Sequence, residues 1–178
     1  SRFGSNKLAA KVDGKMLIEH ALETVPREEF PRVTVVTQYD EVLVLARRFG
    51  FTVLVNPFPE WGASHTVRLG TEAMADCDAI LYQVADQPLL RRESVRAEVE
   101  FFRRHPDRIV AMGHGGVRGN PCIFPARFFP ELTALEGDHG GSAVIRRHED
   151  ALTLFEISPD ELRDVDTPMA LAALRDTL

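Results

Sequence analysis

The chain has 178 residues, a formal net charge of −6, and hydrophobic and charged fractions of 44% and 27%. These values are ordinary for a globular protein of one domain. An acidic chain is poorly suited to nonspecific nucleic-acid binding, which needs a basic face. No segment approaches the roughly 20 apolar residues of a membrane span. We therefore expect one domain over residues 1–178, with neither nucleic acid nor membrane among its partners.

The cysteine content and the amino-terminal sequence bear on the cellular compartment. Cys77 and Cys122 are the two cysteines, too few for a disulfide framework or a zinc site. The sequence also lacks the pattern of a secretory signal peptide. We expect both thiols to be reduced and structural, and the protein to be cytoplasmic.

Helical and strand-like segments alternate along the chain. Helical periodicity is expected over residues 15–25, 40–49, 64–75, 93–105, 126–135, 142–147 and 168–178. Strands are expected over residues 33–37, 52–55, 79–86, 109–112, 120–124 and 152–157. This alternation predicts an α/β fold with a Rossmann-like, mainly parallel sheet and helices on both faces.

The segment with the clearest functional signal is the apolar run that stops at Asp86-Gln87-Pro88. A near-continuous apolar run is typical of a strand buried on both faces, and Pro88 cannot continue a strand ladder. Ligands of open α/β sheets bind at the carboxyl ends of the strands. We expect Asp86 to hold Mg²⁺ against a substrate phosphate, although a turn or cap carboxylate is the plainer alternative.

Two further constellations carry charge suited to phosphate and metal. Arg2 and Lys7 lie on a loop that contains glycine, where two cations can surround a triphosphate or simply be solvated. Asp166 could supply a second carboxylate for Mg²⁺. Alternatively, Asp166 favours the dipole of a helix that Thr167 caps and Pro168 begins.

The loop over residues 56–62 contains two prolines and one glycine, and it leads into a helix near Ser64. The free N–H groups of a helix start attract anions. We expect His65 to be exposed in the first turn, with contact to a ligand as the alternative, and Trp61 either to stack on a base or to pack. The glycine-rich loops at 119–121 and 137–141 could approach a ligand closely or form ordinary turns.

The amino terminus reads as a loop that should follow a strand. Residues 1–7 are polar apart from Phe3 and Gly4, and a sheet of this kind normally opens with its central strand. We expect the given sequence to be incomplete at its amino terminus, without the first strand and most of the phosphate loop.

Taken together, the segments resemble the molybdenum cofactor cytidylyltransferase family of the MobA-like NTP transferase superfamily. The resemblance follows the order of the family's motifs along nearly the whole chain. The matching segments are Ser1-Arg2-Phe3-Gly4-Ser5-Asn6-Lys7, Gly14-Lys15-Met16-Leu17, Asn56-Pro57 to Gly62, Ser64 to Gly70, Ala85-Asp86-Gln87-Pro88-Leu89, Gly119-Asn120-Pro121, Gly137-Asp138-His139-Gly140 and Asp164-Val165-Asp166-Thr167-Pro168.

The resemblance implies a reaction and a set of site residues. It implies transfer of CMP from CTP to molybdopterin-type molybdenum cofactor with release of pyrophosphate, Mg²⁺ as cofactor, and a client molybdenum enzyme as a further partner. It favours CTP over GTP because of the block over residues 62–70. The implied residues are Arg2, Lys7 and Asp86 for catalysis, these three with Ser64 and Arg68 for the nucleotide, Gln87, Asn120 and Asp138 for the acceptor substrate, and Asp86 and Asp166 for the metal.

Some positions depart from the family pattern. Ala85 replaces a glycine, Gly141-Ser142 replaces an Ala-Arg pair, and Met169-Ala170 replaces an acidic pair. The alternatives left open are a guanylyl or other NTP transferase with a different phosphorylated acceptor, and a non-catalytic module that binds nucleotide or cofactor like a chaperone.

Overall fold

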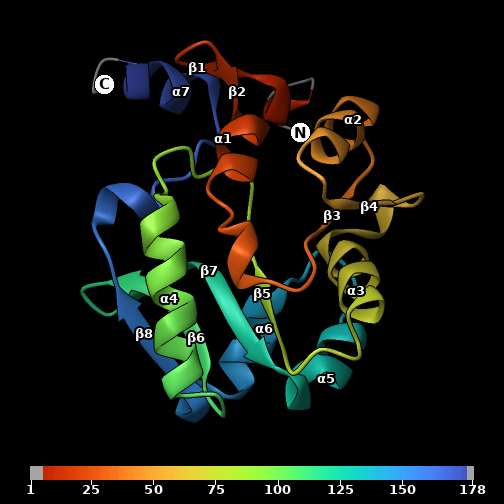
Figure 1. Cartoon of the computed structure of the whole chain (residues 1–178), viewed down its shortest axis with the longest axis vertical. Helices are drawn as coiled ribbons and strands as arrows, with labels where there is room; N and C mark the ends of the chain where they lie inside the picture. The colour runs from red at the N-terminus through yellow and green to blue at the C-terminus, as the bar shows by residue number, and fades with distance from the viewer. Residues whose placement is uncertain (1–5, 176–178) are drawn as a thin grey trace.

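A computed structural model describes residues 6–175 of the chain (Figure 1). The helices are α1 (Leu17–Glu23), α2 (Asp40–Arg48), α3 (Ala63–Ala73), α4 (Arg92–Arg104), α5 (Phe129–Thr133), α6 (Gly141–Arg147) and α7 (Pro168–Arg175). The strands are β1 (Lys11–Val12), β2 (Lys15–Met16), β3 (Thr34–Thr37), β4 (Thr52–Val55), β5 (Ala79–Tyr82), β6 (Ile109–His114), β7 (Val117–Pro125) and β8 (Leu152–Glu156). Within residues 6–175, no helix has both the length and the apolar character needed to cross a membrane.

The main sheet has four strands in the order β5-β7-β6-β8, and β3 and β4 form a separate parallel pair. β6 and β8 are also parallel, whereas β7 runs antiparallel to both of its neighbours. β7 reverses because a tight turn joins it to β6, and the two central glycines of that turn, Gly115 and Gly116, have φ of 56° and 81°. The expected α/β fold is confirmed, with a mixed sheet.

β5 is shorter than the sequence predicts. It ends at Tyr82, which lies opposite Cys122 of β7, and not at Asp86. The next position of β7 is Pro121, which has no N–H to donate to β5. The apolar run therefore leaves the sheet after Tyr82, and Asp86 follows on irregular backbone.

Helices cover both faces of the four-stranded sheet (Figure 1). On one face, Val95 and Val99 of α4 pack near Met112 and Val110 of β6. On the other face, side chains of α5 and α6 pack around Phe124 of β7. Each fully buried apolar side chain of this kind contributes about 1.5–3 kcal/mol relative to leaving it in water.

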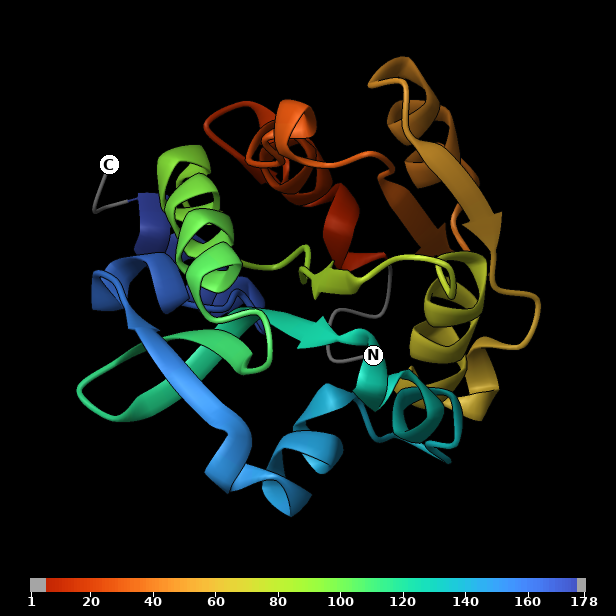
Figure 2. The same cartoon turned by 60° about the horizontal axis from the view of Figure 1, so that its bottom comes forward.

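A large cavity separates the β3–β4 pair from the four-stranded sheet. Its volume is about 1150 Å³, and the residues of β3 and β5 line it together with apolar side chains of α1 and α3. In both views the β3–β4 pair stands apart from β5 and β7 (Figures 1 and 2). Among the described residues, β3 pairs only with β4, and β5 pairs only with β7. Each therefore leaves one strand edge unpaired toward this cavity.

The two ends of the described chain meet on one side of the molecule. The β1–β2 hairpin contacts α7, and the two lie together at the top of Figure 1. Val12, Leu17, Val165 and Leu174 form a small buried cluster there. This cluster fixes the segment before α7 close to the carboxyl end of β5.

Candidate active site

Asp86 and the segment before α7 are joined through the backbone. The Val165 N–H donates to the carbonyl oxygen of Asp86 at 2.8 Å. The Val165 side chain is fully buried beside Val12 and Leu17. Asp166 lies within 3.2 Å of Lys7, which also contacts Asp86, and Asp164 is close enough to both carboxylates to interact with their charges. Two motifs far apart in the sequence thus bring three carboxyl groups together.

Lys7 bridges two of these carboxylates. It begins the 3₁₀ helix η1 (Lys7–Ala9), whose Leu8 N–H is capped by the Asn6 side chain. The Lys7 ammonium donates to Asp86 Oδ2 at 2.7 Å and to Asp166 Oδ1 at 3.2 Å. Of the three side chains, Asp86 is 19% exposed and Lys7 29%, whereas Asp166 is 60% exposed. The strongest ion pair of the site is therefore Lys7 with Asp86.

The charges of the cluster shift the pKa values of two of its members. Burial by itself would lower the pKa of Lys7, but the hydrogen bonds and charges of Asp86 and Asp166 raise it above the usual value. Burial raises the pKa of Asp164, and repulsion by Asp86 and Asp166 raises it further, with partial relief from Lys7. Asp164 is a member of the site that the sequence did not assign, although its spacing of two from Asp166 could have indicated it.

A smaller cavity of about 370 Å³ has Leu8, the residue after Lys7, in its lining. It lies between the carboxyl ends of β3 and β4, the start of α3 and the loop that contains Asp138. Its lining includes Leu8, Thr37, Gln38, Asn56 and Thr66. The Asn56 amide group donates to Thr66 Oγ1 at 3.1 Å. Hydroxyl and amide groups in a cavity of this size suit a polar ring, and Leu8 links the cavity directly to Lys7.

The start of α3 is closed by the glycine-rich loop over residues 136–140. The Ala63 N–H donates to Asp138 Oδ1 at 3.2 Å, and the Ser64 N–H donates to the Gly137 carbonyl at 3.2 Å. Asp138 also lines the smaller cavity. The structure therefore places Asp138 at the smaller cavity and at the helix start, where its negative charge meets the positive end of the helix dipole.

Ser64 and Arg68 lie on α3 away from the lining of both cavities. Ser64 is buried, and its hydroxyl donates to the Trp61 carbonyl at 3.4 Å. The Arg68 guanidinium donates to the carbonyls of Thr133 and Leu135 at 3.1 and 3.4 Å. In this structure both side chains hold α3 to its neighbours, and their expected contact with nucleotide stays a prediction.

The expectation that His65 is exposed is wrong. It is 8% exposed, and both of its ring nitrogens are buried without a hydrogen-bond partner among the described residues. Trp61 stacks on Phe58 with ring centroids 4.3 Å apart, and both rings meet the His65 ring edge-on. The stacked pair covers the imidazole, which the sequence alone could not reveal, while Trp61 itself stays 51% exposed.

The remaining predicted residues fall around the same edge of the sheet. Gln87 directly follows Asp86 and is buried, with a side-chain oxygen that has no partner among the described residues. Asn120 lines the larger cavity and precedes Pro121 through a cis bond. Arg2 lies outside the described residues.

The donor set fits a divalent cation of the magnesium type. Asp86 and Asp166 already share one cation, the Lys7 ammonium, which stands in for a metal between hard oxygen ligands. Within residues 6–175, no group of three or more potential ligand side chains is arranged to hold a metal ion. A metal here would therefore need oxygen ligands from water or from substrate phosphates as well.

These features define an α/β domain that presents a lysine, a carboxylate cluster and a polar cavity at the carboxyl edge of its strands. Comparison with protein families gives a match to the MobA-like NTP transferase domain over residues 1–152. The chain therefore belongs to the MobA-like NTP transferase domain family. The family expected from the sequence motifs is confirmed at this level.

Curated relatives include enzymes for two different nucleotides. The chain is 30% identical over 148 residues to phosphoenolpyruvate guanylyltransferase of Mycolicibacterium gilvum, covering 79% of this chain and 65% of that protein. It is 25% identical over 107 residues to 3-deoxy-manno-octulosonate cytidylyltransferase of Francisella philomiragia, covering 59% of this chain and 43% of that protein. The matched region thus spans 43% of the length of the cytidylyltransferase and 65% of that of the guanylyltransferase.

Solved structures share the fold. A nucleotidyl transferase from Methanothermobacter matches with a TM-score of 0.79 and 22% identity, over 96% of this chain and 84% of that one. Molybdopterin-guanine dinucleotide biosynthesis protein A from Archaeoglobus fulgidus matches with a TM-score of 0.70 and 13% identity, over 99% of this chain and 92% of that one. A Mycobacterium tuberculosis protein solved with manganese matches with a TM-score of 0.76 and 17% identity, over 100% of this chain and 95% of that one.

Proposed function

We propose that this chain is a Mg²⁺-dependent nucleotidyltransferase that moves CMP from CTP to a molybdopterin-type molybdenum cofactor and releases pyrophosphate. The observation that carries the proposal is the placement of Lys7 between Asp86 and Asp166, next in the chain to Leu8, which lines a cavity of about 370 Å³. A nucleoside in that cavity would direct its phosphates toward the lysine and the carboxylates, as this reaction requires.

The choice of substrates rests on the sequence motifs and on the relatives. CTP is supported by the block over residues 62–70 and by similarity to a cytidylyltransferase. The molybdenum cofactor as acceptor is supported by the ordered motifs at 85–89, 119–121 and 137–140, and by the shared fold of a molybdopterin-guanine dinucleotide biosynthesis protein. A client molybdenum enzyme would receive the product.

In the proposed reaction, an oxygen of the acceptor phosphate attacks the α-phosphorus of CTP. A new P–O bond forms there as the bond to the β-phosphate oxygen breaks, and pyrophosphate leaves with the electron pair. The second pKa of a phosphate monoester is about 6, so the attacking oxygen is already deprotonated at neutral pH and no general base is needed. The protein mainly positions the two substrates and stabilises charge.

Each side chain of the site has a defined task in this reaction. The Lys7 ammonium neutralises the charge that develops on the leaving pyrophosphate. Asp86 and Asp166 would hold Mg²⁺, which supplies Lewis-acid stabilisation of the phosphate oxygens when it is bound. The similar fold solved with manganese supports a divalent metal. Asn120 and Gln87 remain the proposed contacts to the acceptor, whereas Asp138, which the motifs also assign to the acceptor, lines the cavity proposed here for the nucleoside.

The test combines binding with product detection. Calorimetry should show CTP binding that depends on Mg²⁺, and a pyrophosphate-release assay should show turnover with molybdopterin-type acceptor. Asp86→Ala should reduce binding and turnover by tenfold or more, because the metal loses its most buried ligand. Asp150→Asn, an exposed carboxylate far from the cluster in the sequence, is the matched control. Undiminished binding by Asp86→Ala would contradict the proposal.

A second candidate is guanylyl transfer to another phosphorylated acceptor. The 30% identity with phosphoenolpyruvate guanylyltransferase favours it. Parallel assays with CTP and GTP against a panel of phosphorylated acceptors separate the two candidates by the pair that releases pyrophosphate. Tight nucleotide binding without release for any acceptor would instead indicate the non-catalytic module.

A further inference from the structure

Lys7 pairs with the same two carboxylates that are proposed to hold the metal ion. Its ammonium lies 2.7 Å from Asp86 Oδ2 and 3.2 Å from Asp166 Oδ1, so one cation occupies the space between the two oxygens. A Mg²⁺ ion bound to the same oxygens would approach each of them to about 2.1 Å. Two cations sharing this small space would repel strongly, since like charges a few ångströms apart interact unfavourably at a half-buried site.

Geometry allows Lys7 to leave this position. Its side chain is still 29% exposed, and lysine is a flexible point charge that can turn toward a new partner. The residue is held at its backbone, because η1 is capped by Asn6 and its Leu8 contributes to the smaller cavity. Rotation of the side chain alone would therefore free the ammonium from the carboxylates without moving η1.

We propose that Lys7 is an internal counterion that a divalent metal displaces from Asp86 and Asp166, and that the released ammonium then binds the triphosphate. The second half of this inference rests on the proposed function. Displacement opposes metal binding when no phosphate is present, because the lysine loses two ion pairs. A triphosphate restores partners to the lysine, so metal and nucleotide bind cooperatively. The lysine thereby weakens metal binding in the absence of nucleotide.

The first test measures metal binding alone. Mn²⁺ is titrated into the full chain without nucleotide, followed by electron paramagnetic resonance and calorimetry. Lys7→Met removes the competing cation and should bind Mn²⁺ about fivefold or more tightly than the unmodified protein, within the usual range of coupling between sites. Lys7→Arg keeps a cation at the carboxylates and should bind no more tightly than the unmodified protein.

Two controls show that any gain is local. Lys15→Met removes a lysine that pairs with Glu23 on the surface, and should leave Mn²⁺ binding unchanged. Lys7→Met with Asp86→Asn should lose the gained affinity, because the metal then lacks a ligand. Thermal unfolding of each variant establishes that it is folded before titration.

The outcomes separate this inference from the proposed function. Equal or weaker Mn²⁺ binding by Lys7→Met, or no Mn²⁺ binding by any variant, would overturn the exchange even if CTP still releases pyrophosphate. Tighter Mn²⁺ binding with no pyrophosphate release from any nucleotide would support the exchange and reject the function. Addition of CTP should raise the Mn²⁺ affinity of the unmodified protein more than that of Lys7→Met. Equal gains would overturn the proposal that the released ammonium binds the triphosphate.

Discussion

Glu98 carries a carboxyl group in an environment that disfavours its charged form. It lies on α4 at 0% exposure, and neither carboxyl oxygen has a hydrogen-bond partner among the described residues. Burial raises its pKa well above the usual value, and the nearby Met112 backbone amide offsets only part of that rise. Glu98 is therefore protonated in the folded protein at a pH where the unfolded chain has already lost that proton.

This difference predicts a pH-dependent stability. Because the folded pKa is the higher one, the contribution is fully present below the unfolded value near 4.5 and is lost as the pH rises toward the folded value. The slope can reach about 1.4 kcal/mol per pH unit. Glu98→Gln cannot ionise, so its urea-unfolding free energy should fall less steeply above about pH 5. Glu100→Gln, on the exposed side of α4, should keep the original slope, and equal slopes for all three proteins would refute the assignment.

At the scale of elements, the contact between the start of α3 and the 136–140 loop is very close. Gly62 has φ of 83°, and a Cβ there would lie 2.6 Å from the Gly137 carbonyl oxygen. Gly62→Ala should therefore displace the loop, open the smaller cavity and destabilise the fold by about 1–3 kcal/mol. Chemical denaturation and nucleotide calorimetry measure the two effects.

Gly70→Ala on the same helix is the matched control. A Cβ there meets only Val36 Cγ2 at 3.5 Å, an ordinary contact. Because alanine is favoured over glycine inside a helix, Gly70→Ala should stabilise the protein by roughly 0.5–1 kcal/mol. Similar losses from both substitutions would show that the loop contact is not what makes Gly62 necessary.

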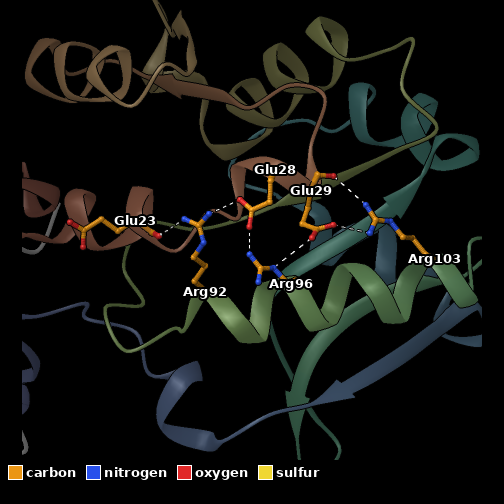
Figure 3. A network of polar contacts seen from close by, with 6 residues as sticks. All are labelled: Glu23, Glu28, Glu29, Arg92, Arg96 and Arg103. Atoms are coloured by element: carbon orange, nitrogen blue, oxygen red, sulfur yellow. Dashed lines mark hydrogen bonds and ion pairs between the residues drawn. The ribbon is translucent and has the colours of Figure 1, made fainter.

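A network of ion pairs joins α4 to the segment between α1 and β3 (Figure 3). Glu28, on the 3₁₀ helix η2 (Arg27–Glu29), pairs with Arg92 and Arg96. Glu29 pairs with Arg103 at 2.8 Å and with Arg96 at 3.6 Å. η2 leads directly into β3, so these pairs link the two sides of the divided sheet.

Arg96 contacts both glutamates, so its replacement tests the network. Arg96→Met should lower the melting temperature in low salt and have less effect in about 1 M NaCl, where ions screen exposed pairs. Arg47→Met, on the exposed side of α2, should show no such salt dependence. An equal loss for Arg96→Met at both salt concentrations would mean that packing of its stem, and not charge, matters there.

The sequence predicted elements better than it predicted contacts between them. Local patterns located α2 and β4 closely, and Thr167 caps α7 as expected, since its hydroxyl accepts from the Ala170 N–H at 3.1 Å. The meeting of Asp86 with the 164–166 segment followed from family motifs, whereas the Val165 N–H bond that joins them is a tertiary contact. The contact of Arg68 with the carbonyls of Thr133 and Leu135 is also tertiary, and the sequence pattern of α3 does not indicate which neighbouring element Arg68 contacts.

At the scale of the whole molecule, the cavity between β3 and β5 leaves strand edges without hydrogen-bond partners among the described residues and apolar surface without packing. Two strands line it with edges that no described residue pairs, and its volume of about 1150 Å³ is lined mainly by apolar side chains. Unpaired backbone groups and exposed apolar surface both cost free energy. A strand seated between β3 and β5 would pair with both edges and unite the separate sheets.

This arrangement predicts the effect of an added strand. An apolar extension of about six residues, joined ahead of Ser1 through a short flexible linker, should raise the melting temperature by several degrees, because it buries apolar surface and pairs both edges. Hydrogen exchange should show new protection in β3 and β5. A matched extension with alternate residues changed to aspartate should give neither effect. If both extensions act alike, or if protection appears away from β3 and β5, the cavity is not a strand-binding position.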